Sequence, residues 1–254
     1  MAVIEPAVGL ADIERAARTL DGLVRETPML AAGEISRRVG SRVRLKAENL
    51  QLTGSFKPRG ASNKIAGLSQ TQLEAGVVAA SAGNHAQGLA FAARRLGARA
   101  VVCMPSSAPL AKIAAVRQYG AEVRLIEGSY DEAQDAAREL AETEGRTLVP
   151  AFDDPDVVAG QGTVGLEIAR QAPAARLVVV PLGGGGLATG IAIAVKARLP
   201  GMRVVGVQAE ACAPYPASLA AHRPIGERSA NTICDGIAIK RPGDFTLPLS
   251  LIHI

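Results

Sequence analysis

The chain has 254 residues, 48% of them hydrophobic and 20% charged, with a formal net charge of +4 at pH 7. This length allows one large core or two modest ones, and scattered basic residues with only 3% aromatic residues disfavour nucleic-acid binding. No N-terminal leader pattern and no apolar stretch long enough to cross a bilayer is present, so we expect a cytoplasmic protein without membrane insertion.

Short apolar segments alternate with helical patterns from residue 43 onward. The predicted strands are residues 43–48, 77–81, 100–104, 122–126, 147–149, 177–181 and 203–209. The predicted helices between several of them are residues 86–96, 110–119, 133–144 and 188–198. This alternation predicts parallel sheets.

Local signals mark the ends of these helices. Pro109 suits a first-turn position, and Ser129 with Glu132 forms a capping box ahead of the helix at 133–144. Three glycines are expected to end successive helices: Gly97, Gly120 and Gly145.

Lys57 lies among small residues, between Gly54 and Pro58 and directly after Phe56. A lysine on a solvated helix face needs neither a glycine nor a rigid proline, whereas a lysine that must meet a planar cofactor at one angle benefits from both. Residues 53–60 therefore indicate a displayed reactive amine. The alternative is an ordinary solvated lysine.

Residues 81–88 follow a predicted strand and open the helical pattern at 86–96. A strand, a glycine turn and a helix start place several unpaired backbone N–H groups in one concavity, where carboxylates and phosphates bind. The alternative interpretation is that Asn84 only caps the helix and that His85 is a surface residue.

Four consecutive glycines occupy residues 183–186, between a predicted strand and a predicted helix. Their amides can surround an anion, helped by the dipole of the helix that follows, so the segment predicts a phosphate cradle. Two alternatives stay open. One is a dinucleotide-binding turn, with Glu210 about two dozen residues further on, and the other is a purely structural glycine turn.

In this order, the three segments resemble the threonine dehydratase (threonine ammonia-lyase) family of pyridoxal-phosphate enzymes, which is also close to serine racemase. The likeness covers nearly the whole chain and includes residues 27–28, 48–51, 159–163, 235–238 and 241–243. It implies an α/β fold of type II, like that of the tryptophan synthase β subunit, with two domains of open, twisted, mostly parallel sheets and helices on both faces. It also implies pyridoxal 5′-phosphate as the cofactor.

In the resembled family the chain leaves a large cofactor-binding domain, builds a smaller one and returns. We therefore expect residues 1–50 and 149–254 to form the large domain and residues 51–148 the small one. The cofactor would lie between them, and their relative motion would close the site over substrate. The resemblance also implies a homo-oligomer, a dimer or a tetramer.

The resemblance assigns a role to each motif. Lys57 would form the resting Schiff base and, once released, would take the Cα proton as general base. Phe56 would pack against the pyridine ring, and Asn84 would hydrogen bond to the ring oxygen. The cofactor phosphate would be bound by Gly183, Gly184, Gly185, Gly186 and Leu187. The substrate carboxylate would be bound by the turn of Ser81, Ala82, Gly83, Asn84 and His85.

The implied reaction is β-elimination, which converts L-threonine to 2-oxobutyrate and ammonia, and L-serine to pyruvate. Racemising relatives carry a second serine where this chain has Ala82. A methyl group cannot donate a proton, so we expect elimination ahead of racemisation. The resemblance leaves open whether threonine or serine is preferred, and whether the role is isoleucine biosynthesis or threonine catabolism.

No metal site is expected. Glu210 lies where metal-binding relatives place a carboxylate ligand, but the residues after it lack the aspartate that would complete the site, and a hard cation needs several oxygens. The cysteines are odd in number and widely spaced, which fits neither a disulfide framework nor a zinc site.

The resemblance breaks at the end of the chain. After residues 241–246 the family continues with further strands and helices, including a segment that meets the ring nitrogen of the cofactor, whereas this chain stops after residues 249–254. We therefore expect a C-terminally truncated sequence. This supports a second hypothesis, a catalytically poor fragment that keeps its phosphate-binding turn. A third, disfavoured hypothesis is a nicotinamide-binding protein.

Overall fold

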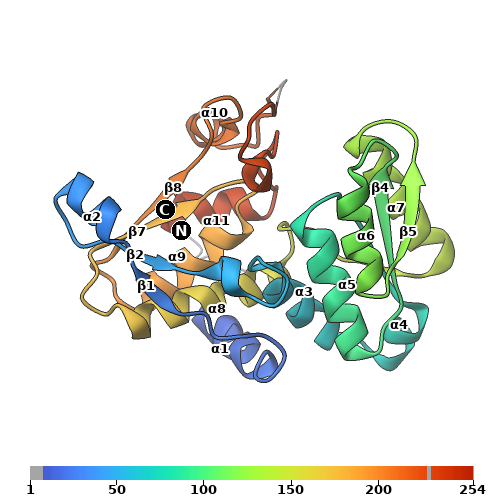
Figure 1. Ribbon diagram of the computed structural model, residues 1–254, viewed down its shortest axis with the longest axis horizontal. Coiled ribbons are helices and arrows are strands. Elements are labelled where there is room, and N and C mark those ends of the chain that lie inside the picture. The colour runs from blue at the N-terminus through green and yellow to red at the C-terminus, as the bar shows by residue number, and fades with distance from the viewer. Residues whose placement is uncertain (1–7, 228–229, 254) are drawn as a thin grey trace, which may run out of the picture.

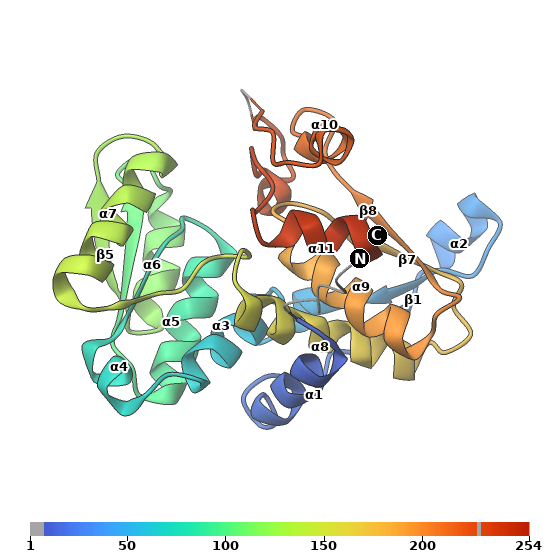
Figure 2. The same cartoon turned by 180° about the vertical axis from the view of Figure 1, so that it is seen from behind.

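The computed structural model describes residues 8–227 and 230–253, so residues 1–7, 228–229 and 254 of the expected large domain lie outside the described residues. Figures 1 and 2 show two lobes side by side. We call residues 57–148 the small lobe and the other described residues the large lobe. The division into domains at residues 51 and 148 stays a prediction, because it concerns relative motion.

The small lobe consists of α3 (Lys57–Ala66), α4 (Gln70–Ala75), β3 (Val77–Ala80), α5 (Asn84–Leu96), β4 (Ala100–Pro105), α6 (Leu110–Gln118), β5 (Glu122–Ile126), α7 (Tyr130–Glu144) and β6 (Thr147–Leu148). Its strands form one parallel sheet in the order β5-β4-β3-β6. The strands predicted at 77–81, 100–104, 122–126 and 147–149 are thus confirmed to within a residue or so at their ends.

Side chains of the central strands alternate between the two faces of this sheet, as the pleat requires. Val77 packs in one cluster with Leu89 of α5, whereas its neighbour Val78 packs in another with Ala133 of α7. Figures 1 and 2 show α7 on one side of the sheet and α5 with α6 on the other. Burial on both faces explains why β3 and β4 are apolar throughout.

The large lobe consists of α1 (Leu10–Thr19), β1 (Met29–Ala31), α2 (Gly33–Val39), β2 (Arg44–Lys46), η1 (Glu48–Leu50), α8 (Pro155–Gln171), β7 (Leu177–Pro181), α9 (Gly186–Arg198), β8 (Arg203–Val207), α10 (Pro214–Ala221), η2 (Asp235–Ile237) and α11 (Thr246–His253). β7 and β8 are parallel, as the alternation predicted.

One strand departs from the predicted parallel pattern. β2, within the predicted strand at 43–48, pairs antiparallel with β1, which the sequence did not indicate. A parallel pair needs a crossover element that buries one face on the sheet. α2, which connects the two strands, has no buried residue, so the chain returns beside β1 instead of crossing over it.

Glycines let α8 approach its two neighbours closely and so hold both lobes together. A Cβ placed on Gly160 would lie 2.6 Å from the carbonyl oxygen of Arg59 in α3, and one placed on Gly190 of α9 would lie 2.5 Å from that of Val158. Any side chain at these crossings would push the helices apart. α8 therefore fixes α3, which begins with Lys57, relative to α9, which begins with the last of the four consecutive glycines (Figure 1).

Most helix-end signals are confirmed. Ser129 and Glu132 form the capping box of α7, and Gly97 and Gly145 end their helices in the left-handed conformation. Pro109 differs from the prediction, since it is the residue that precedes the first turn of α6 rather than part of that turn. None of the described helices combines the length and the apolar character that a membrane span needs.

Candidate active site

Lys57 is the first residue of α3 and follows a turn in which Gly54 has a φ of +74°. Its Nζ donates a hydrogen bond to the carbonyl oxygen of Ala151 at 2.6 Å and lies 5.1 Å from the centre of the Phe56 ring. A Cβ on Gly88 of α5 would lie 2.8 Å from the Lys57 Cβ. Gly88 therefore lets α5 pack directly against the lysine backbone.

The amine of Lys57 has a depressed pKa. Its side chain is partly buried, and within the described residues it makes no ion pair with a carboxylate. Burial without a compensating negative charge disfavours the ammonium form, which lowers the pKa from 10.5 to about 8. Lys57 is thus partly buried and hydrogen bonded, unlike a fully solvated surface lysine.

His85 is buried, with 4% of its surface exposed, and its Nε2 hydrogen bonds to the carbonyl oxygen of Val149 at 2.8 Å. Burial, and secondarily the positive charge of Lys57, lowers its pKa to about 3. The ring is therefore neutral, and Nε2 carries the proton it donates. The alternative that His85 is a surface residue is wrong.

The turn at residues 81–85 leaves several amides free. Ser81 Oγ accepts hydrogen bonds from the N–H groups of Gly83 and Ala86, each at 3.2 Å. The N–H groups of Ala82, Asn84 and His85 donate to no acceptor in the described part of the chain. Gly83, rather than Asn84, occupies the N-cap of α5, and a glycine has no side chain to cap the helix. These amides suit an anion.

The glycine run at residues 183–186 is packed so tightly that it has no room for side chains. A Cβ on Gly184 would lie 2.4 Å from the ring of Phe152, and one on Gly185, whose φ is +107°, would lie 2.1 Å from the Tyr215 hydroxyl. Among the described residues, no acceptor is bonded to the N–H groups of residues 183–187. Steric fit and free amides together match a phosphate cradle at the start of α9.

The three predicted segments converge on two stretches of chain. Residues 149–152 accept hydrogen bonds from His85 and Lys57 and pack against the glycine run. Around η2, a Cβ on Gly236 would lie 4.0 Å from the Asn84 side-chain nitrogen, and the Cα of Ile237 would lie 3.2 Å from a Cβ on Gly183. The lysine, the anion turn and the glycine run therefore surround one region of the molecule.

Other residues of this region escaped the sequence analysis. The buried hydroxyls of Thr53 and Ser55, just before Lys57, have no partner among the described residues. Phe152 forms the wall of the glycine run, and Thr246 donates a hydrogen bond to the Gly184 carbonyl oxygen at 2.6 Å. The local sequence signal near Phe152 is the Asp154-Pro155 pair, which is typical of a helix start and so indicates a loop before α8.

Glu210 is exposed. In the part of the chain that the structure describes, no group of three or more His, Cys, Asp or Glu side chains could hold a metal ion.

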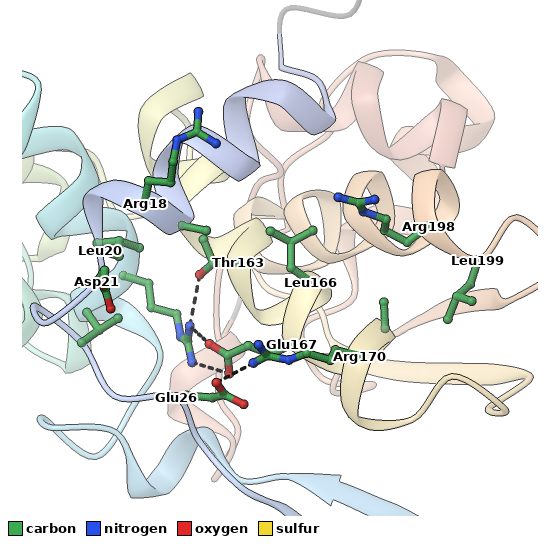
Figure 3. A pocket seen from close by; sticks show the side chains of 14 residues that line it. Arg18, Leu20, Asp21, Glu26, Thr163, Leu166, Glu167, Arg170, Arg198 and Leu199 are labelled. Atoms are coloured by element: carbon green, nitrogen blue, oxygen red, sulfur yellow. Dashed lines mark hydrogen bonds and ion pairs between the residues drawn. The ribbon is translucent and has the colours of Figure 1, made fainter.

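A cavity of about 760 Å³ lies elsewhere, between α1, α8 and the end of α9, and none of the predicted site residues lines it (Figure 3). At its inner wall, Arg59 hydrogen bonds to Glu167 at 2.6 Å and to Thr163 at 3.1 Å. Because the Arg59 guanidinium is already bonded to Glu48, Glu167 and Thr163, this wall is a buried ionic contact rather than a ligand site.

Comparisons with known proteins agree with the geometry. The chain is 48% identical over 242 residues to an L-threonine ammonia-lyase of Thermotoga maritima, covering 95% of this chain and 60% of that protein. It is 43% identical to a catabolic L-threonine dehydratase of Escherichia coli K12, covering 94% of this chain and 73% of that protein. The chain thus spans well under the full length of these relatives, and 43% of a biosynthetic L-threonine dehydratase of Pasteurella multocida.

Two solved structures have the same fold. The processed form of threonine deaminase isoform 2 from Solanum lycopersicum superposes with a TM-score of 0.91 at 39% identity, covering 96% of this chain and 67% of that one. A maize serine racemase superposes with a TM-score of 0.94 at 33% identity, covering 98% and 75%. The predicted α/β fold of type II is confirmed. The family model described as "Pyridoxal-phosphate dependent enzyme" matches residues 20–253, and the chain therefore belongs to that family.

Proposed function

We propose that the chain carries the catalytic residues of a pyridoxal-phosphate-dependent ammonia-lyase, which converts L-threonine to 2-oxobutyrate and ammonia and L-serine to pyruvate. The observation that carries the proposal is the Lys57 amine, which has a pKa near 8 and contacts the same segment as the glycine run. The relatives named as threonine ammonia-lyase and dehydratase, at 43–48% identity, support the choice of substrate.

The residues present fit the cofactor. The free amides of residues 183–187 would hold its phosphate, in a cradle that any Cβ would fill. Lys57 would bind its aldehyde carbon, Phe56 would contact the ring and Asn84 would donate to the ring oxygen. When bound, pyridoxal phosphate supplies an electron sink conjugated to the substrate amine, which makes the Cα proton removable.

Lys57 can hold and release a proton near neutral pH. With a pKa of about 8, about a quarter of the amines are neutral at pH 7.5, against about one in a thousand at the ordinary pKa. Only the neutral amine can act as a nucleophile or accept the Cα proton at Nζ. His85 is neutral at this pH, so it adds no second positive charge beside the Lys57 amine.

The turn at residues 81–85 would bind and orient the substrate. Its free amides form the N-terminus of α5, whose dipole favours a carboxylate. Fixing the carboxylate fixes the direction of the Cα–H bond relative to Lys57. The nicotinamide alternative is disfavoured, because it assigns no role to Lys57 or to this turn.

Racemisation is the second candidate, and the similarity to a maize serine racemase favours considering it. Ala82 argues against it, because the side chain beside Ser81 has no proton to donate. We expect pyruvate to form from L-serine much faster than D-serine. D-serine formation at a rate that rivals pyruvate would reverse this order.

A test follows the visible absorption of the chain with pyridoxal phosphate before and after L-threonine, together with release of 2-oxo acid. We expect a lysine-bound cofactor band that shifts with threonine and yields 2-oxobutyrate. Lys57→Ala should abolish both, whereas Lys240→Ala, at an exposed lysine, should leave both intact. A stable band without product would favour binding without catalysis, and no band would overturn the cofactor assignment.

We further propose a homodimer or homotetramer located in the cytoplasm. Light scattering after size exclusion tests the first statement, since a monomer at micromolar concentration would contradict it. Localisation of the tagged chain in cells tests the second.

A further inference from the structure

The carbonyl group of Gly184 is held from one side by two donors. Thr246 Oγ1 donates to it at 2.6 Å, and the Gly243 N–H donates to it at 3.3 Å. Both donors come from the segment that starts α11, about sixty residues further along the chain than the glycine run. Thr246 is completely buried, so its hydroxyl has no water to exchange with.

Fixing this carbonyl also fixes the next amide. The Gly184 carbonyl and the Gly185 N–H belong to one planar trans peptide, in which the two groups point in opposite directions. With the carbonyl turned towards Thr246, the N–H is turned away from it. That N–H has no acceptor among the described residues. The φ of +107° at Gly185 is accessible to glycine and strained for other residues.

Asp153 holds Thr246 in place. Its carboxylate accepts the backbone N–H groups of Asp244, Phe245 and Thr246, each at 3.0 Å, so it caps the start of α11. Gly243 leaves room for this contact, because a Cβ there would lie 1.8 Å from Asp153 Oδ1.

The same short segment supports the glycine run on its other side. Phe152, the residue before Asp153, packs its ring against Gly184 and its backbone against Gly186. Residues 152 and 153 therefore hold the run directly through the ring and indirectly through the cap on Thr246.

We propose that Thr246, anchored by Asp153, is a positioning residue that aims the Gly185 amide at the phosphate of the cofactor. The proposal rests on the proposed function, since it takes pyridoxal phosphate as the ligand of the cradle. A residue that only stabilised the fold would affect the folded state for every ligand alike. A residue that aims one amide at a phosphate affects only ligands that carry the phosphate.

The test compares binding of pyridoxal phosphate with binding of pyridoxal, which lacks the phosphate, by absorption titration of the purified chain. For wild type we expect a strong preference for the phosphorylated ligand. Thr246→Val keeps the shape but loses the donor, and it should weaken pyridoxal phosphate binding about tenfold while leaving pyridoxal binding unchanged. Thr246→Ser keeps the donor and should retain the preference.

A second variant protects the test against misfolding of Thr246→Val, which circular dichroism would reveal. Asp153→Asn keeps one of the two carboxylate oxygens and should lower the preference by an intermediate factor. If Thr246→Val or Asp153→Asn folds and keeps the full wild-type preference, the positioning role is wrong while the cofactor assignment stands. If wild type binds both ligands equally, the cradle is not a phosphate site and both proposals fall.

Discussion

The Nζ of Lys57 donates a hydrogen bond to the carbonyl oxygen of Ala151 at 2.6 Å. This acceptor carries no net charge, so it stabilises the ammonium form less than a carboxylate would, and burial lowers the lysine pKa to about 8. Ala151 immediately precedes Phe152, the wall of the glycine run. One segment therefore places the amine relative to the phosphate cradle.

The depressed pKa of Lys57 predicts that this lysine costs stability. Between pH 8 and 10.5 the unfolded chain holds a proton that the folded chain has released, so stability rises with pH in that window. Below pH 8 the penalty is complete. Lys57→Met should therefore stabilise the cofactor-free chain by about 1–3 kcal/mol at pH 7, and the gain should vanish towards pH 10.5.

Lys64→Met is the matched control, measured by the same denaturant titration. Lys64 pairs with Asp154 and Asp156 at 2.9 Å each, and despite some desolvation these carboxylates raise its pKa. Its contribution is present below pH 10.5 and is lost as pH rises through the raised pKa, so this variant should be less stable at pH 7. A less stable Lys57→Met would contradict the depressed pKa.

Gly184 should tolerate no side chain. In Gly184→Ala the new Cβ would meet three ring atoms of Phe152 at 2.4 Å. We expect a loss of about 1–3 kcal/mol in stability and at least about a tenfold loss in pyridoxal phosphate affinity. Gly201→Ala is the control, since no heavy atom lies within 4 Å of that position. Equal effects of the two changes would show that the run is not sterically constrained.

His85 should make the fold sensitive to acid. Its pKa is about 3 in the folded chain, against an ordinary value of 6.5, so the unfolded chain binds the extra proton between these values and stability falls as pH drops through that window. His85→Gln can still donate to Val149 and does not titrate. Relative to wild type, this variant should gain about 2–3 kcal/mol between pH 7 and pH 4, measured by thermal unfolding.

The control for His85 is His85→Ala, which leaves the Val149 carbonyl without its donor. Compared with His85→Gln, this variant should be less stable at every pH, because both lack the titrating ring and an unpaired buried acceptor costs about 1–3 kcal/mol. If His85→Gln shows the same acid sensitivity as wild type, another group causes it.

The sequence was sufficient for features that are encoded locally. Strands such as Ala100–Pro105 are apolar because they are buried on both faces, and Gly97 ends α5 because glycine accepts the left-handed conformation. The glycine run and the turn at residues 81–85 could be recognised in the same way, because glycines between a predicted strand and a predicted helix are visible in the local sequence. The roles of these residues in binding stay predictions.

Contacts between distant segments could not be predicted in this way. Asp153 caps a helix that starts more than ninety residues later, and no spacing in the sequence connects them. β1 was missed because three residues are too few to show alternation. His85 hydrogen bonds to Val149, which lies 64 residues further along the chain, beyond two further helices.

Arg59 joins the lobes through a buried ionic cluster. Its guanidinium contacts Glu48 at 2.9 Å and Glu167 at 2.6 Å, and only 1% of its side chain is exposed. Lys46 also pairs with Glu167, so two cations balance two carboxylates. Desolvation opposes its charge, but the hydrogen bonds to both carboxylates raise the Arg59 pKa.

Arg59→Met should leave two largely buried carboxylates with one cation and should cost about 3–5 kcal/mol in the free energy of unfolding. Arg59→Lys keeps the charge but not the planar fork that reaches both carboxylates, so it should recover only part of the loss. Arg138→Met removes an exposed pair with Asp135 and should cost only about 0–1 kcal/mol. Urea titration of the three variants measures these differences in the free energy of unfolding.

The same cluster should affect cofactor binding. Because Lys57 lies two residues before Arg59 on α3, Arg59→Met should also weaken pyridoxal phosphate binding, whereas Arg138→Met should not. Unchanged cofactor affinity in a folded Arg59→Met chain would mean that α8 alone positions α3.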